Sequence, residues 1–387
     1  MNRTAWYKIL LVVAIVAITT TAGIQLYAHR HFDTPIVLGS GVTRVGKLSD
    51  YCSSLEGTIG DTNVFFLEGK EPGGTALVIA NTHPNEIAAG LSAFLMVENG
   101  VMEQGTLIVI PMYNNSASRA TRPGDGYPLY YEIETEWGAA KFRMGNRDAS
   151  PVDQWPDPDV YIHYPDGQSL SYIDIRNTNR TWPGRENGVL TERIAYAAMQ
   201  LMEQEDVDIA FDLHGAETMF PVTNCIVAPD QSMRIASMAS LTVKCTEGFD
   251  NHVEPSPTNY HGLSHREIAD HSDVLPFLLE APIPFLDQPT GPKTVELLLD
   301  GKDPLLLSLA AQNRLFVPYD ETGWSIDQRV GQHLSVMLEL MNQWTRKNGD
   351  APIISSGIPK YADILENSVG GYLLNPDEAD PDKIYLE

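Results

Sequence analysis

Two titratable side chains stand three residues apart at the point where a strand pattern gives way to a helix pattern. His83 and Glu86 belong to the segment "NTHPNEI", which follows an apolar run at 75–80 and precedes apolar residues at helical spacing. On the first turn of a helix, side chains separated by three residues can converge on one metal ion. His214 closes a second apolar run, at 208–214, and is expected to arrive from a neighbouring strand. Two histidines and one glutamate form a recurring ligand set of catalytic zinc sites, which keep a further position open.

The chain around these residues alternates between patterns typical of strands and of helices. Buried strands are predicted for five short apolar runs, at 75–80, 106–111, 208–214, 224–229 and 276–282. Helices are predicted at 87–99, 190–202, 230–247 and 326–344, with Asp230 and Ser325 as N-terminal caps of the last two. This alternation predicts an α/β fold whose mixed central sheet is covered by helices on both faces. Ligands of such sheets bind beyond the carboxyl ends of the strands, so His83, His214 and Glu280 are expected to meet there.

The composition of the chain limits the classes of partner. The 387 residues are 43% hydrophobic and carry a formal net charge of -25. That length and hydrophobic fraction suffice for a large globular core. The negative balance argues against nucleic acid as a partner, because proteins that bind nucleic acid carry basic surfaces that neutralise phosphates. The oligomeric state does not follow from these numbers.

The first 28 residues differ in composition from the rest. Arg3 and Lys8 precede the apolar run 9–18, and no charged side chain follows until after Ala28. The apolar core has the length found in a signal peptide, whereas the whole uncharged span is about long enough to cross a bilayer. A cleaved signal peptide and an uncleaved signal anchor therefore both stay open, beside a buried N-terminal helix. Because the positive charges come first, either of the first two would place the remaining chain outside the cytoplasm, as a periplasmic, secreted or membrane-anchored protein.

One catalytic domain is expected to follow, at 33–348. Within it, the stretch 114–184 is rich in Pro, Gly, Tyr, Asp and Arg and has no sustained period. A structureless loop of that length is unusual in a compact domain, so an insertion that builds a surface or a cleft wall is predicted. The tail at 349–387 is polar with scattered apolar residues, and no pattern assigns its fold.

Four motifs in order resemble the zinc carboxypeptidase superfamily, and especially its succinylglutamate desuccinylase and aspartoacylase branch. They are "NTHPNE", "NRTWPG", "DLHG" and "LLEAP", and they fall within 75–282. That branch characteristically shows a Gly/Thr-His-Gly-Asn-Glu segment, Asp-Leu-Asn-Arg before Phe-Pro-Gly, an Asp-Leu-His segment and a later Glu. The chain departs from this pattern at Pro84, Asn177 and Thr178, which stand where Gly, Asp and Leu are usual, and it keeps the Asn-Arg pair.

The resemblance implies a metal site and a binding site for a carboxylate. One zinc ion per chain would be held by His83, Glu86 and His214. Asn179 and Arg180 would bind the carboxylate of an amino-acid-like substrate, which agrees with the planar, bidentate recognition that arginine offers. Another divalent ion could occupy the same ligand set under a different metal supply.

The resemblance also implies a general base and a group that polarises the scissile carbonyl. Glu280 would be the base that activates water, and a carboxylate at the end of an apolar run can have its pKa raised toward the working pH. Arg143, Arg147 and Arg176 all lie in the region expected for the polarising arginine, and none matches a motif tightly. Tyr260, which precedes the base by 20 residues, could correspond to a tyrosine of a mobile segment in the peptidases or could simply pack.

The predicted activity is hydrolysis of an amide bond that has an amino acid with a free carboxylate on one side. A small N-acyl amino acid is the first substrate class, as in the deacylase branch. An extracytoplasmic carboxypeptidase that acts on the C-termini of peptides or cell-wall peptides is the alternative. A second alternative is an anchored binding protein that keeps the fold without catalysis. The chain has no Gly-x-Ser-x-Gly elbow and no Gly-x-Gly-x-x-Gly motif, which argues against a serine hydrolase and a dinucleotide site.

Overall fold

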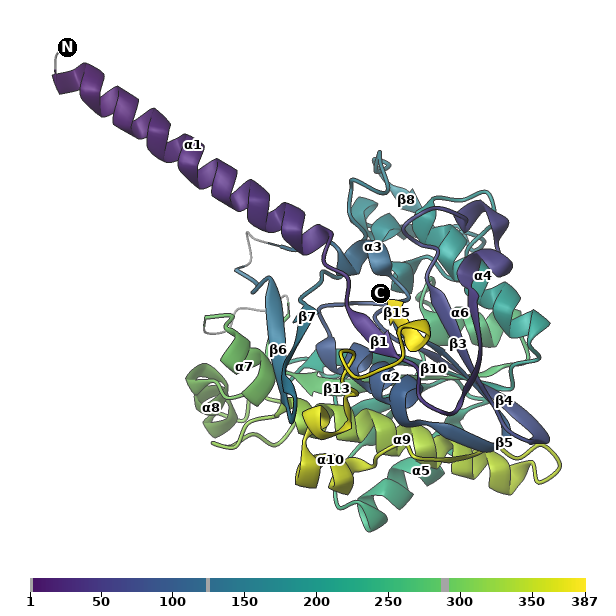
Figure 1. The fold of residues 1–387 in the computed structure, drawn as a ribbon. Coiled ribbons are helices and arrows are strands. Elements are labelled where there is room, and N and C mark those ends of the chain that lie inside the picture. Colours follow the sequence, from purple (N-terminus) through teal and green to yellow (C-terminus); the bar gives the residue numbers. More distant parts are fainter. Residues whose placement is uncertain (1–2, 123–125, 287–291) are drawn as a thin grey trace.

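A nine-stranded sheet forms the centre of the molecule (Figure 1). This computed structural model describes residues 3–122, 126–286 and 292–387. The strands follow the order β12, β11, β13, β10, β4, β5, β3 and β2, and β14 pairs with β5. Their bounds are β2 (Val42–Lys47), β3 (Asn63–Glu68), β4 (Glu71–Ile79), β5 (Val101–Ile110), β10 (Ile209–Glu217), β11 (Cys225–Ala228), β12 (His252–Pro255), β13 (Leu275–Ile283) and β14 (Ile354–Ser356).

The sheet is mixed. β13, β10, β4 and β5 run parallel to one another, and β12 is parallel to β11. The pairs β11–β13, β3–β5, β2–β3 and β14–β5 are antiparallel. Because the inner strands are parallel, their carboxyl ends open on one edge of the sheet. The predicted α/β fold with a mixed central sheet is confirmed.

Helices cover both faces of the sheet, since neighbouring strand residues point to opposite sides. Val78 and Val109 pack in one hydrophobic cluster, whereas Leu77 and Ile108 pack in another. The first cluster includes side chains of α2 (Ile87–Asn99), α5 (Met233–Thr246) and α9 (Ile326–Lys347). The second includes side chains of α4 (Leu190–Gln204) and α6 (Ser264–His271). The strands predicted as buried are thus covered on both sides.

Each of the five predicted apolar runs lies in or overlaps a strand, namely β4, β5, β10, β11 and β13. The four predicted helices correspond to α2, α4, α5 and α9, and Ser325 caps α9 as expected. The prediction of Asp230 as a cap is wrong. The N-cap of α5 is Ser232, because residues 229–232 form a turn in which the Ser232 N–H donates to the carbonyl of Pro229 at 2.9 Å.

The position predicted for the first two titratable residues is also wrong by one turn. α2 begins at Ile87, so His83 lies before the helix and Glu86 is its N-cap. A tight turn closes between them, in which the Glu86 N–H donates to the His83 carbonyl at 2.9 Å. This turn brings the two side chains together without a helical turn.

The stretch 114–184 contains several short helices and strands. They are α3 (Asn115–Ser118), the hairpin β6 (Tyr130–Thr135) with β7 (Gly138–Arg143), and the small pair β8 (Tyr161–Ile162) with β9 (Ser169–Leu170). Single turns of 3-10 helix at Tyr172–Arg176 and Thr178–Arg180 end the segment. Arg147, Asn179 and Arg180 of this stretch line a cavity.

The tail that the sequence left unassigned packs on the body. β14 joins the central sheet, and β15 (Ile384–Leu386) pairs with β1 (Pro35–Val37). Between them, α10 (Tyr361–Asn367) contacts α9. Two further helices, α7 (Val295–Asp300) and α8 (Pro304–Ala311), lie at one side of the molecule (Figure 1).

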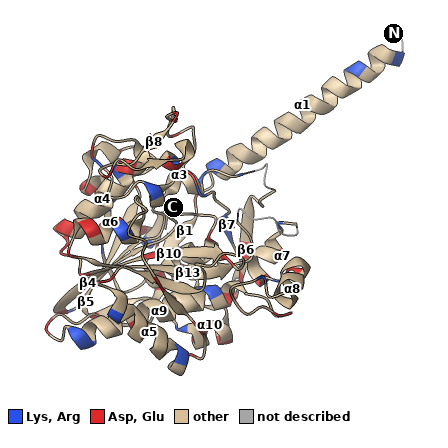
Figure 2. Cartoon of the chain, turned by 180° about the vertical axis from the view of Figure 1, so that it is seen from behind, with Lys and Arg blue, Asp and Glu red and all other residues tan. Residues whose placement is uncertain are grey.

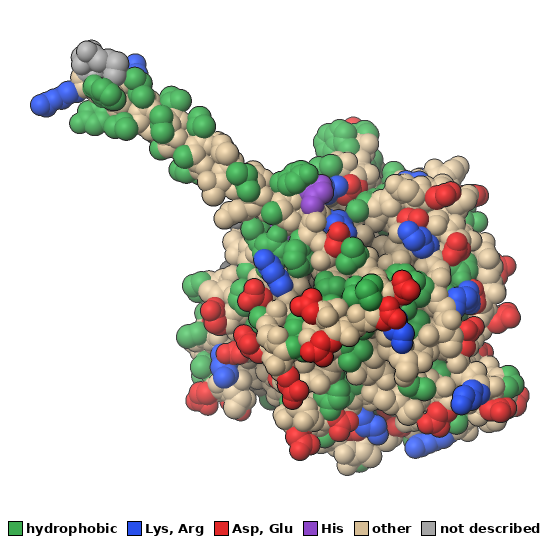
Figure 3. Space-filling view, viewed as in Figure 1, with side chains coloured by type: hydrophobic (Ala, Val, Ile, Leu, Met, Phe, Trp, Pro, Cys, Tyr) green, Lys and Arg blue, Asp and Glu red, His purple; other side chains and the backbone are tan. Residues whose placement is uncertain are grey.

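The helix α1 (Arg3–Arg30) projects from the body (Figure 1). It contains an 18-residue window with a mean hydropathy of 2.3, none of which is buried, and it is long and apolar enough to cross a membrane. Basic residues stand near its two ends with an uncharged stretch between them (Figure 2), and apolar side chains line the helix (Figure 3). A signal sequence has the same features, and the exposed helix is not a core helix of the body.

Removal of the α9 cap is expected to destabilise the protein. The hydroxyl of Ser325 accepts a hydrogen bond from the N–H of Gln328. In return, the side-chain oxygen of Gln328 accepts a hydrogen bond from the N–H of Ser325. A Ser325→Ala variant should lose about 1 kcal/mol of unfolding free energy, measured by thermal or denaturant unfolding of the full chain in detergent. Ser308→Ala, at an exposed helical position of α8, is the control, and equal stabilities of the two variants would contradict the capping role.

Candidate active site

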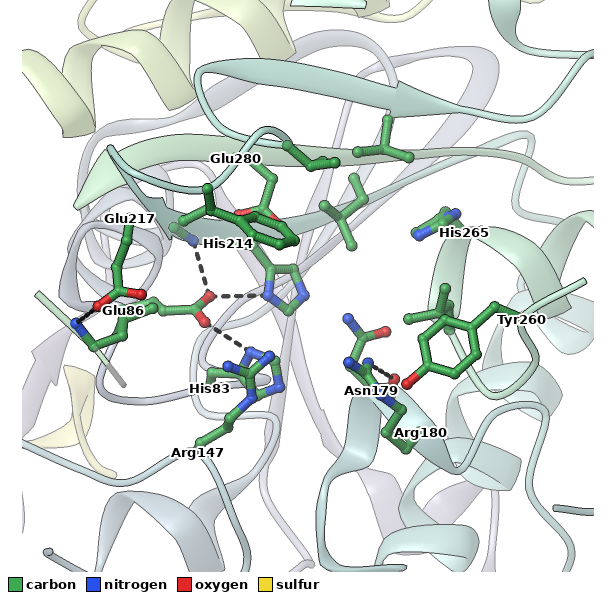
Figure 4. A pocket seen from close by; sticks show the side chains of 18 of the residues that line it. His83, Glu86, Arg147, Asn179, Arg180, His214, Glu217, Tyr260, His265 and Glu280 are labelled. Carbon is green, nitrogen blue, oxygen red and sulfur yellow. Dashed lines mark hydrogen bonds and ion pairs between the residues drawn. The ribbon is translucent and has the colours of Figure 1, made fainter. Parts of the chain in front are cut away.

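A cavity of about 440 Å³ opens at the carboxyl ends of β4, β10 and β13 (Figure 4). It is large enough for a small-molecule ligand. All six residues singled out by the motifs line it: His83, Glu86, Asn179, Arg180, His214 and Glu280. Their convergence follows from the parallel strands, because the turn after β4 lies next to β10, and His214 of β10 is in register with Glu280 of β13.

The carboxylate of Glu86 stands between two imidazoles (Figure 4). Its Oε1 lies 2.8 Å from Nδ1 of His83, and its Oε2 lies 2.9 Å from Nδ1 of His214. The N–H of Gly215 donates to the same Oε2 at 2.8 Å. All three side chains are buried, and their ligand-type atoms lie within 4.8 Å of one another. The predicted metal ligands thus form one compact cluster.

Each imidazole has a second partner on its opposite nitrogen. Nε2 of His83 lies 2.8 Å from Oδ1 of Asn177, which also accepts the N–H of Asn179 and is therefore an acceptor. Nε2 of His214 lies 2.9 Å from Oδ2 of Asp212 as an ion-pair contact that lacks hydrogen-bond geometry. Metal-binding histidines characteristically donate their other ring N–H to such an oxygen, which leaves the first nitrogen free to ligate. The residues present therefore fit a zinc ion bound by both Nδ1 atoms and the Glu86 carboxylate.

The charges around the cluster favour the same donor set. Burial opposes charge on Glu86, but the two imidazoles outweigh it and hold the pKa of that carboxyl below its usual value. Burial, with smaller contributions from Arg147 and His214, outweighs the opposing effect of Glu86 and lowers the pKa of His83 to about 4, so this imidazole is neutral at neutral pH. For His214, burial is outweighed by Asp212 and Glu86, and its pKa lies well above the usual value. A metal ion that binds here displaces the proton of His214, as is general for histidine ligands.

Glu280 approaches the cluster from β13 (Figure 4). Its Oε2 is buried and has no hydrogen-bond partner among the described residues. Burial raises the pKa of Glu280 to about 8, with a further contribution from the nearby Glu86 and opposing contributions from His214 and Arg147. A carboxyl group with a raised pKa, an unpaired oxygen and a place beside a cluster of potential metal ligands can take up and return a proton.

Polar groups on the opposite wall could bind an anion. Arg180 lines the cavity and lies with its guanidinium carbon 5.1 Å from the ring centroid of Tyr260, which lines it too (Figure 4). The carbonyl of Asn179 accepts one N–H of Arg180 at 2.7 Å, and its side-chain oxygen accepts the N–H of Ser264 at 2.9 Å. The Nε of Arg180 is buried and has no acceptor in the described part of the chain. Burial lowers the pKa of Arg180 from its usual value, and an anion would compensate this loss of hydration.

Only one of the three arginines left open by the sequence lines this cavity in the described chain. Arg147 stands beside His83 (Figure 4). Arg143 instead donates to Ser118 at 3.2 Å and to the carbonyl of Glu387 at 3.1 Å, away from the metal ligands. Arg176 lies 3.1 Å from a carboxylate oxygen of Asp157.

Two residues that support the cluster had not been predicted. Asp212 precedes His214 by two residues in β10, so both point to the same face, and this spacing was a usable signal. Thr82 and Ser264 hold its carboxylate with hydrogen bonds of 2.8 and 2.5 Å. Asn177 stands out in the sequence as a departure from the family pattern, at a position where Asp is usual. No local sequence pattern connects it with His83, which is 94 residues away in the chain.

Comparison with known proteins finds similarity among solved structures alone. No family model and no curated protein sequence matches the chain. A metallo-carboxypeptidase from Burkholderia cenocepacia matches with a TM-score of 0.46 and 12% identity over 84% of this chain and 69% of that one. A succinylglutamate desuccinylase from a Silicibacter species and an aspartoacylase family protein from Mesorhizobium loti each match with a TM-score of 0.35, at 16% and 18% identity. The last two matches cover 57% of this chain and only 53% and 55% of the two relatives.

The similar structures thus bear the names of both branches that the motifs resemble. Their TM-scores lie below 0.5, and their identities are low.

The amide oxygen of Asn177 is expected to tune metal binding. An Asn177→Ala variant should bind zinc about 10- to 100-fold more weakly, because His83 loses the acceptor that fixes its ring. Competition with a chromophoric zinc chelator measures the affinity. Asn179→Ala is the matched control, since Asn179 lies in the same turn without contacting either imidazole, and equal losses in both variants would contradict the role of Asn177.

Proposed function

We propose that the protein is a zinc-dependent hydrolase of an amide bond that has an amino acid with a free carboxylate on one side. The observation that carries this proposal is the unpaired carboxylate oxygen of Glu280 beside the cluster of His83, Glu86 and His214, in one cavity with Arg180. A binding protein without catalysis would not need a base of raised pKa at this place. The hydrolase is therefore preferred to the anchored binding protein.

The metal ligands and the base divide the chemistry. His83, Glu86 and His214 would hold the zinc ion, which supplies a Lewis acid for the scissile carbonyl and lowers the pKa of water. Glu280 would remove a proton from the attacking water and return it to the nitrogen of the leaving amine. Its raised pKa suits the return step, and the charge of a bound cation favours the deprotonated form that the first step requires.

Positively charged side chains would orient the substrate. Arg180, with Asn179 beside it, would bind the substrate carboxylate through two parallel N–H groups. The ring of Tyr260 would hold the guanidinium group of Arg180 through a cation–π contact. Arg147, which lies beside His83, would stabilise the negative charge that develops on the carbonyl oxygen.

The remaining wall of the cavity suggests the chemistry of the rest of the substrate. It is lined by the apolar side chains of Phe220, Val222, Val227, Pro257, Leu263, Leu278 and Leu286. Such a wall fits an apolar acyl group or an apolar side chain. A cavity of about 440 Å³ favours a small N-acyl amino acid over a long peptide. The carboxypeptidase alternative requires the peptide chain to leave the cavity toward solvent.

The helix α1 supports a proposal for the place of action. As a signal anchor or signal peptide, this helix would place the catalytic body at 33–348 outside the cytoplasm. An anchored form would meet peptides or N-acyl amino acids near the membrane surface.

Glu280→Gln is expected to abolish turnover while zinc stays bound, because the amide cannot accept a proton. N-acyl amino acids and peptides that share a C-terminal residue serve as substrates, and a preference for the first decides between the two substrate classes. Glu217→Gln is the matched control, since that carboxylate lies in the same cavity and accepts the N–H of Leu286 at 2.7 Å. Full activity of Glu280→Gln would exclude its role as the base.

Arg180→Lys is expected to lower kcat/KM by about 10- to 100-fold for substrates with a free carboxylate, because lysine cannot make the bidentate contact. The variant should lose much less activity on the corresponding carboxamides, which make no ion pair. Arg176→Lys, outside the cavity, is the control. The same loss on carboxylates and carboxamides would contradict the proposed contact.

A further inference from the structure

A second cluster of potential metal ligands lies outside the cavity. His163 and Asp166 belong to the turn between β8 and β9, whereas His261 precedes α6 and Glu267 lies within it. One ligand-type atom of each residue lies within 4.8 Å of the others. None of the four is among the described residues that line the cavity. The cluster therefore needs an explanation separate from the active site.

The tautomer of His163 is set by its surroundings. Its Nε2 lies 2.6 Å from the carbonyl oxygen of Trp182, so Nε2 carries the proton and donates it. In the neutral ring, Nδ1 then has a free lone pair. That atom is buried, makes no hydrogen bond to any described residue, and points toward Oδ2 of Asp166 at 3.5 Å. A backbone carbonyl on one ring nitrogen and an unused lone pair on the other is the arrangement that metal-binding histidines show.

Glu267 presents a second unused lone pair. Its residue is fully buried, and its Oε1 accepts the N–H of Gly262 at 2.9 Å and lies 2.9 Å from Nδ1 of His261. Its Oε2 is buried and makes no hydrogen bond within the described chain, although Nε2 of His271 approaches to 3.2 Å. Nδ1 of His261 also lies 3.1 Å from Oδ2 of Asp166.

A hydrogen-bonded network alone does not satisfy these groups. A proton on Nδ1 of His261 can serve Asp166 and one oxygen of Glu267. It leaves His163 Nδ1 and Glu267 Oε2 buried without a hydrogen bond to any described residue, which is costly, and their nearest charged neighbours are Asp166 at 3.5 Å and His271 at 3.2 Å. A divalent cation would accept electron pairs from all four side chains, and its charge would balance the two carboxylates.

We propose that His163, Asp166, His261 and Glu267 bind a second divalent metal ion, for which zinc is the best match. Two histidines and two carboxylates complete a four-coordinate shell, which leaves no open position and indicates a structural site. Of the four side chains, Asp166 and His261 are partly exposed, at 31% and 22%, so the ion can enter from solvent.

The proposed ion would fix one wall of the active site. It would join the turn between β8 and β9 to the segment that carries Tyr260 and Gly262. Gly262 packs closely against Arg180, since a Cβ there would lie 2.2 Å from the Arg180 carbonyl oxygen. Its own carbonyl accepts the N–H of Trp182. The ion would thus hold Tyr260 and Arg180 in place without touching the substrate.

The test compares the zinc content of four full-length chains. They are purified in detergent, saturated with Zn²⁺, desalted and analysed by elemental mass spectrometry. The chains are the wild type, His83→Ala/His214→Ala, His163→Ala/Asp166→Asn and the combination of all four substitutions. Expected contents are close to two, one, one and no zinc ions per chain, respectively, with a lower melting temperature when the second cluster is altered.

The design separates this proposal from the one on the active site. The second site is overturned if His163→Ala/Asp166→Asn keeps the zinc content of the wild type, or if His83→Ala/His214→Ala binds no zinc. If His163→Ala/Asp166→Asn alone lost all zinc, the second site would stand and the first would fail. Asp166→Asn by itself controls for misfolding, because this residue lies in a turn and is partly exposed, so the fold should tolerate the change. This single variant should still lose one zinc ion per chain. His252→Ala, which removes an exposed histidine 3.3 Å from Glu254, should keep both ions.

Discussion

The carboxylate of Glu86 is the group on which the candidate active site depends. It is buried between two imidazoles and a backbone N–H, where a carboxylate without these partners would be strongly destabilised. Its partners come from the turn after β4 and from β10. The pairing therefore requires that the two strands be neighbours in the sheet, and it couples the cluster of candidate metal ligands to the fold itself.

The surrounding elements hold this arrangement in place. Asn177 lies at hydrogen-bond distance from the outer nitrogen of His83. Asp212, fixed by Thr82 and Ser264, forms an ion-pair contact with the outer nitrogen of His214. From the other side, His333 of α9 contacts the His214 carbonyl at 2.8 Å. The parallel register then places Glu280 beside His214. The cavity is thus organised by the sheet, and the 114–184 segment supplies its polar wall with Arg147 and the Asn179–Arg180 pair.

The two clusters of titratable residues share one arrangement of contacts. The first cluster lines the cavity, whereas the second lies outside it. In both, one histidine nitrogen is occupied by an oxygen acceptor and the other faces a carboxylate. At the active site this arrangement leaves room for a substrate. In the proposed second site, four side chains surround the ion, so its effect on catalysis would pass through the positions of Tyr260 and Arg180.

The amino-acid sequence by itself determined five strands of the central sheet, four of the helices that cover it, the α9 cap and the residues that would meet at the strand ends. Each of these rests on local spacing: apolar runs, helical periodicity, and a histidine three residues before a glutamate. Tertiary structure alone decided that His83 and Glu86 meet across a turn before α2, that Arg147 rather than Arg143 or Arg176 reaches the cavity, and that Asn177 supports His83. It also brought His163 and His261 together, whose ring centroids lie 5.9 Å apart. These contacts join residues that are far apart in the chain. The periodicity of a sequence predicts local helices and strands, and it does not predict which distant side chain will contact a given buried atom.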